Sequence, residues 1–161
     1  MFDLLRARPA RKAAYSVLEP FVLKTSANGA GLQAGDWLQP QILGFLATVV
    51  TLIVERRCGE LQTHALASVQ SSVLNALTGI GPELVGEEIC LLSSRRDPAF
   101  TAGSTGALAF LEALDAARPA AGELVVMEPL DANSSVSGRR TLDELWHDHV
   151  ERHMRQGQFL T

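Results

Sequence analysis

The sequence contains little of what secreted and membrane proteins carry. Its 161 residues include only two cysteines, Cys58 and Cys90, which form neither a CxxC pair nor a disulfide framework. Such isolated thiols are typical of a reducing compartment. The first residues lack the continuous apolar core of a signal peptide. The longest apolar run, 42–54, has 13 residues, fewer than the roughly 20 needed to cross a bilayer. We therefore expect a cytoplasmic protein without a membrane span.

Aromatic and charged residues are also sparse. Aromatic residues make up 6% of the chain and charged residues 20%, whereas apolar residues reach 47%. This composition is usual for a globular protein, and the length fits one domain. Leucine and alanine are abundant, which favours helices. Because the net charge is −4 and no basic patch carries interleaved aromatics, we expect no nucleic-acid partner.

Apolar spacing and helix-start signals predict about five helices in one core domain, residues 1–118. They cover approximately 9–24, 40–57, 63–78, 83–94 and 107–117. Pro20 should kink or divide the first helix, and the segment 95–106 is predicted to be a loop. In the second helix a stripe of small residues would let another helix approach closely: Gly44, Ala47, Thr48 and Thr51.

Beyond Pro119 the composition changes. Residues 119–140 are polar and turn-rich, as in a linker. The only stretch with strand character, 124–127 (LVVM), has no partner strand within the chain, so it would be extended, helical or paired across a dimer. Residues 141–161 are predicted to form an amphipathic helix, with Thr141 and Glu144 as a capping box. The predicted fold class is an all-α, single-domain bundle with this linker and C-terminal helix.

Three of the four histidines lie in the C-terminal helix. His149 and His153, at i and i+4, could both reach one metal ion. The helical zinc motif places a glutamate directly after its first histidine as general base, but Val150 stands there and Glu151 should point to the opposite side. A third ligand would have to come from elsewhere: His64, Cys58, Cys90 or a carboxylate. We therefore prefer to interpret His149 and His153 as packing residues, with a metal site as the alternative.

One broad face of the C-terminal helix is the predicted contact surface. It consists of Leu142, Leu145, Trp146, His149, Val150 and His153. Trp146 is the kind of residue that dominates interface energetics. Such a helix docks either on a partner or on its own core, and both interpretations remain open at this point.

One other segment has the composition of an anion site, and a second is basic. The segment 102–106 (AGSTG) precedes the predicted fifth helix, where free N–H groups could bind an anion. The residues of this hypothesis are Arg95, Arg96, Gly103, Ser104 and Thr105. No lysine follows the glycines and the spacing is not that of a P-loop. Near the N-terminus four cations follow apolar residues: Arg6, Arg8, Arg11 and Lys12. Such a segment could lie on an anionic membrane surface. Because Pro9 should interrupt a continuous helix, we interpret it instead as a solvated helix end.

No nucleophile elbow or carboxylate dyad occurs in the sequence, so we name no catalytic residue and no cofactor. The leading hypothesis is a non-enzymatic, cytoplasmic protein-interaction or regulatory module, whose partner is another protein or a second copy in a homodimer. One alternative is a metal-binding helical protein or metal-dependent hydrolase that uses His149 and His153. A second alternative is a protein that binds phosphate or a small molecule at 103–106.

Overall fold

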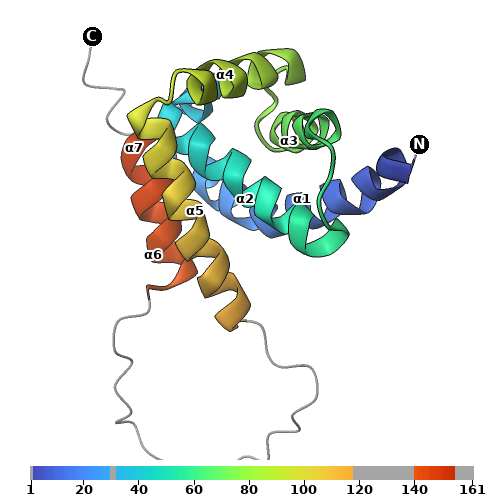
Figure 1. The fold of residues 1–161 in the computed structure, drawn as a ribbon. Coiled ribbons are helices and arrows are strands. Elements are labelled where there is room, and N and C mark those ends of the chain that lie inside the picture. The colour runs from blue at the N-terminus through green and yellow to red at the C-terminus, as the bar shows by residue number, and fades with distance from the viewer. Residues whose placement is uncertain (1, 30–31, 118–139, 155–161) are drawn as a thin grey trace, which may run out of the picture.

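The computed structural model describes residues 2–29, 32–117 and 140–154, and within these ranges every regular element is helical (Figure 1). The elements are α1 (Phe2–Asn28), a 3-10 turn (Ala34–Leu38), α2 (Pro40–Cys58), α3 (Thr63–Thr78), α4 (Pro82–Ser94), α5 (Pro98–Ala117), α6 (Leu142–Trp146), a π-helical turn (His147–Glu151) and α7 (Arg152–Met154). The all-α prediction is confirmed. The stretch 124–127, nearly all of the predicted linker and residues 155–161 of the predicted C-terminal helix lie outside the described residues. From here on, the C-terminal helix means residues 142–154. None of the described helices is long and apolar enough to span a membrane.

Helix α2 is the centre of the fold. Pro40 occupies its first turn, as predicted, and Gly59 ends it with a positive φ of 74°. The helix packs against α1, α3, α5 and the π-helical turn (Figure 1). Such a position requires a helix that is apolar on nearly all sides, and ten of its residues are buried: Ile42, Leu43, Gly44, Phe45, Leu46, Ala47, Val49, Val50, Ile53 and Val54.

Glycines bring α2 and α5 into close backbone contact. A Cβ atom added to Gly44 would collide with the carbonyl oxygen of Phe100, and one added to Gly103 would collide with the carbonyl oxygen of Gln41. Each helix therefore places a glycine against the backbone of the other. The small-residue stripe predicted in α2 does allow a close approach, and the approaching helix at Gly44 is α5.

Helix α5 begins at Pro98, so the predicted loop over 98–106 is wrong. Asp97 starts the helix: its Oδ1 accepts a hydrogen bond of 3.0 Å from the Phe100 N–H, and proline suits the first helical position. The glycines that suggested a loop lie inside the helix. They are tolerated there because close packing leaves no room for a side chain, at Gly103 against α2 and at Gly106 against His149.

Helix α1 begins at Phe2 and runs through Pro20 to Asn28, so Pro20 does not divide it. Each proline costs the helix one backbone hydrogen bond. Pro9 and Pro20 are both exposed, whereas residues spaced four apart form a buried stripe: Ala10, Ala14, Leu18 and Val22. Burial of this stripe against α2 and α3 offsets the missing hydrogen bonds.

Replacing Gly103 by alanine should destabilise the protein by about 1–3 kcal/mol, because the added methyl group pushes α2 and α5 apart. The matched control is Gly86→Ala in α4, where an added Cβ meets nothing within 4 Å. This second change should stabilise the protein by about 0.5–1 kcal/mol through the higher helix propensity of alanine. Urea unfolding of both variants measures the difference, and equal effects would contradict the close-contact argument.

Candidate functional site

The C-terminal helix docks on its own core. Leu145, Trp146, Val150 and Met154 are at most 4% exposed, packed within the same hydrophobic core as α1, α2 and α5. Leu142, His149 and His153 are half-buried. The capping box of Thr141 and Glu144 is present, as predicted. The surface predicted to contact a partner is thus, in this structure, an intramolecular packing surface.

Trp146 completes a cluster of aromatic rings. Its ring centroid lies 5.2 Å from that of Phe21, 5.9 Å from that of Phe45 and 6.4 Å from that of Phe110. These distances are typical of stabilising aromatic pairs. The three phenylalanines come from α1, α2 and α5, so Trp146 joins the C-terminal helix to three others.

A chain of hydrogen bonds starts at the indole of Trp146. Its Nε1–H donates to Thr25 Oγ1 at 2.8 Å, and the Thr25 hydroxyl donates to Glu151 Oε1 at 2.7 Å. The other oxygen of Glu151 lies 3.0 Å from His147 Nδ1. Burial alone would raise the pKa of Glu151, but hydrogen bonds from His147 and Thr25 and the charges of His147 and Lys24 together lower it. These hydrogen bonds therefore satisfy the buried hydroxyl of Thr25, and the last of them is an exposed ion pair.

The sequence pattern predicted that Glu151 points away from the buried face, and the π-helical turn explains why it does not. In this turn the Arg152 N–H donates to the carbonyl of His147, five residues earlier. The wider turn keeps Trp146, Val150 and Met154, which are spaced four apart, on the buried side. It also rotates Glu151 toward Thr25 of α1.

His149 fills the notch that glycine leaves in α5. A Cβ atom on Gly106 would collide with the imidazole, which stacks on Phe45 with centroids 5.5 Å apart and an interplanar angle of 11°. Gln41 Nε2 lies 3.5 Å from its Nδ1. Burial lowers the pKa of His149, although the charge of Asp148 opposes this shift. The imidazole is held mainly by packing.

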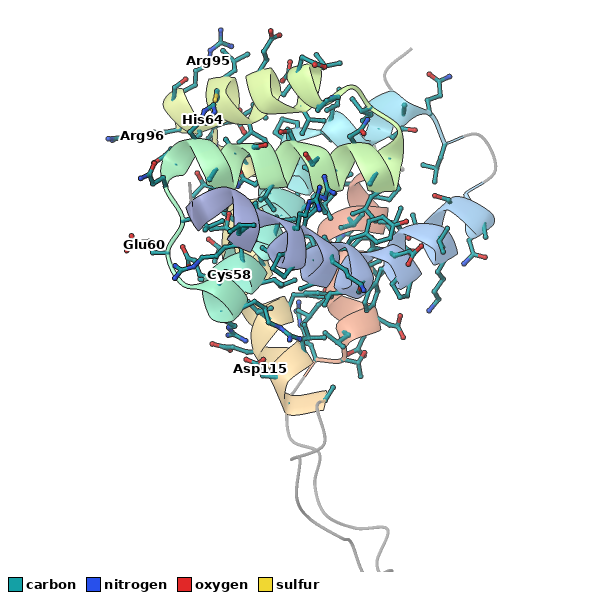
Figure 2. The ribbon with its side chains drawn as sticks, turned by 90° about the vertical axis from the view of Figure 1, so that its right-hand side faces the viewer. Cys58, Glu60, His64, Arg95, Arg96 and Asp115 are labelled. Atoms are coloured by element: carbon teal, nitrogen blue, oxygen red, sulfur yellow. The ribbon has the colours of Figure 1, made fainter. Side chains whose placement is uncertain are left out.

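No metal site forms around His149 and His153 in the described ranges, where no three His, Cys, Asp or Glu side chains gather closely enough to hold an ion. His64 and Cys58 lie at different places on the molecule (Figure 2), and Cys90 is exposed on α4. The third ligand that the metal hypothesis requires is therefore not found among these candidates.

The anion site predicted at 103–105 required free N–H groups at the start of a helix, and the structure does not place these residues there. These residues lie inside α5, where backbone N–H groups bond to the preceding turn, and Gly103 is buried against α2. The hydroxyls of Ser104 and Thr105 donate to the backbone of α5 at 3.1 Å. Arg95 and Arg96 are exposed at the end of α4 and extend outward (Figure 2).

A basic groove lies between α1 and α3, which run side by side on the face shown in Figure 2. We call it the α1–α3 groove. It has a volume of about 700 Å³ and is lined by Arg8, Arg11, Lys12, Tyr15, Ser72, Asn75, Ala76 and Pro82. None of its three cations forms an ion pair with another described residue. Helix α3 contains no Asp or Glu to balance them.

The sequence showed these cations, but it could not show what faces them. We interpreted them as a solvated helix end because Pro9 was expected to interrupt the helix. In the structure α1 continues through Pro9, so Arg8, Arg11 and Lys12 share one helix with Tyr15. The wall opposite them comes from α3, about sixty residues later in the chain.

A second pocket, of about 720 Å³, lies between α5 and α6. Its lining includes four alanines and several charged residues, two of which have partners within the fold. Arg140 pairs with Asp148 and Asp143 pairs with Lys24, both at 2.9 Å. The α1–α3 groove is the better candidate site because its cations are not paired.

Comparison with protein-family models, curated proteins and solved structures found no match for this chain. Its function is therefore inferred from its own residues. The features that bear on function are the α1–α3 groove and the C-terminal helix that docks on the core.

Replacing Thr25 by valine should destabilise the protein by about 1–3 kcal/mol, because the buried indole N–H of Trp146 loses its acceptor. Thr25→Ser is the matched control, since serine keeps the hydroxyl and should cost less. Urea unfolding followed by tryptophan fluorescence gives both free energies. Equal losses in the two variants would show that the hydroxyl does not hold the C-terminal helix.

Stability should fall as the pH drops below about 6.5. Burial lowers the pKa of both His149 and His153 from the ordinary value of 6.5, so the unfolded chain takes up these protons first. Protonation then favours unfolding until the pH reaches the folded-state pKa values. Urea unfolding between about pH 7 and pH 5 should show a shallower decline in the double variant H149Q/H153Q. An unchanged slope would exclude these two histidines as its cause.

Proposed function

We propose that this chain is a non-enzymatic protein-interaction module that binds an acidic segment of a partner protein in its α1–α3 groove. The observation that carries this proposal is a charge imbalance. Three cations line the groove and no carboxylate does, although acidic residues outnumber basic ones by 18 to 14 in the whole chain. Exposed cations without partners attract and orient an acidic segment.

The shape and lining of the groove favour a peptide. The site is open to solvent, and it combines cations with Tyr15, Ala76 and Pro82. Glutamate or aspartate side chains of a bound segment would pair with Arg8, Arg11 and Lys12. Apolar side chains of the same segment would pack on the remaining surface. Arginine and tyrosine are also enriched at protein interfaces.

The proposed location is the cytoplasm. Cys58 and Cys90 are free thiols, and a reducing compartment preserves such thiols. The C-terminal helix has a structural role in this proposal, because its apolar face is buried in the core. The interaction surface predicted from the sequence is thereby replaced by the α1–α3 groove.

A fluorescein-labelled, glutamate-rich peptide of about twelve residues tests the proposal by fluorescence anisotropy. Reversing two groove charges, in the variant R8E/R11E, should raise the Kd about tenfold or more, which corresponds to about 1.4 kcal/mol. The wild-type Kd should also rise with NaCl concentration, because exposed charges are screened by salt.

The matched control is R95E/R96E, which makes the same charge change at the exposed end of α4. Its Kd should stay within about twofold of wild type, because those residues lie outside the groove. Loss of binding in R95E/R96E with retention in R8E/R11E would move the site to the α4–α5 turn. Absence of peptide binding to the wild type at concentrations where sedimentation shows a monomer would refute the proposal.

A further inference from the structure

The face that carries the α1–α3 groove has three neighbouring zones of different charge. Helices α4, α3 and α1 follow one another down this face (Figure 2), and α3 contacts both of the others. Helix α4 contains Glu83, Glu87 and Glu88 but no Lys or Arg. Helix α3 has none of these four charged residue types, and the first half of α1 carries Arg6, Arg8, Arg11 and Lys12. Within the helices themselves the charge is thus acidic, absent and basic in turn, and Arg95 and Arg96 follow directly after the end of α4.

The acidic zone has the chemistry that the α1–α3 groove requires. Glu83 and Glu87 are exposed one helical turn apart, and neither forms an ion pair with another described residue. The same helix exposes two large apolar side chains, Leu84 at 46% and Leu91 at 39%. Helix α4 therefore combines unpaired carboxylates with apolar surface on one element.

The neutral zone presents short side chains outward. Ala67, Ser68 and Ala76 of α3 are exposed, and Ser71 and Ser72 are half-exposed. The distance between two packed helices depends on the side chains at their contact. A second helix can therefore come close to α3 over 67–76 without meeting a charge, whereas the exposed His64 lies before this stretch.

One symmetry operation pairs the acidic zone of one copy with the basic zone of another, and the neutral zones with each other. A twofold axis parallel to α3, lying in the plane of this face, exchanges the positions of α4 and α1 between two copies. It also places each α3 against its equivalent. Most homo-oligomers are twofold dimers in which the same patch of both copies meets itself.

We propose that the partner is a second copy of this chain, with α4 of each copy in the α1–α3 groove of the other and the two α3 helices in contact at the centre. This inference rests on the proposed function, because the α1–α3 groove is the same site. It adds that the acidic segment is α4 and that the assembly closes as a dimer.

Sedimentation of the full chain at several protein concentrations tests the proposal. The wild type should reach twice the monomer mass of 17.3 kDa. The variants R8E/R11E and E83K/E87K each place like charges opposite each other at both symmetric contacts. Each should therefore weaken dimerisation about tenfold or more. Circular dichroism confirms that both variants remain helical, which is expected because all four residues are exposed.

Mixing the two variants distinguishes a closed dimer from open assembly. In R8E/R11E two new acidic groups face the acidic α4, and in E83K/E87K two new basic groups face the basic α1. A mixture should therefore form a dimer of one chain of each variant, with both contacts attractive. Species larger than a dimer would show a head-to-tail arrangement and would overturn the twofold geometry.

A cross-link gives a readout that does not depend on charge. In a chain with Cys58 and Cys90 replaced by serine, Ser68→Cys places a thiol on α3, where it faces its own equivalent across the axis. Oxidation should give a covalent dimer with this variant but not with Thr105→Cys, which is exposed on α5. Equal cross-linking of both variants would overturn the proposed interface.

The outcomes separate this inference from the proposed function. A wild type that stays monomeric at all concentrations but binds the acidic peptide would overturn the dimer and leave the groove as a peptide site. A dimer that persists unchanged in both charge variants would overturn this interface. A wild-type dimer, weakened variants and a restored mixed dimer would support it.

Discussion

The close contact between α2 and α5 is the constraint on which the rest of the structure depends. Gly44 and Gly103 let each helix touch the backbone of the other, and Gly106 leaves the notch that holds His149. Because these positions lack side chains, Phe45 and Phe110 can meet with centroids 5.4 Å apart. Trp146 then closes the cluster. If α2 and α5 were further apart, neither the aromatic cluster nor the packing of His149 between Gly106 and Phe45 would form.

The C-terminal helix shows how a polar network can accompany the docking of an apolar face. Burying the indole of Trp146 requires an acceptor for its N–H, since an unpaired buried donor is costly. Thr25 supplies that acceptor, and its own hydroxyl donates a hydrogen bond to Glu151. The π-helical turn makes this possible because it rotates Glu151 toward α1. The network ends in the ion pair with His147, where solvent can reach it.

The chain divides structural and proposed binding roles between two sides of α2. The C-terminal helix lies on the far side of α2 from α3 (Figure 1). On the α3 side, acidic, neutral and basic helices are neighbours, which is the basis of the proposed interaction. Charges on different elements that are not paired within the fold remain available to a partner. His149 and His153, whose spacing suggested a metal site, lie on the side of α2 that has the structural role.

The sequence by itself determined the helical class, the start of a helix at Pro40 and the capping box of Thr141 and Glu144. These depend on local spacing and on contacts between residues close in the chain. It failed at 98–106, where glycines indicated a loop, because only the packing of α2 and of His149 against α5 explains glycines inside that helix. It also failed at Glu151, whose direction depends on the π-helical turn. The α1–α3 groove was decided by tertiary structure alone, since its walls are separated by about sixty residues and meet only through packing.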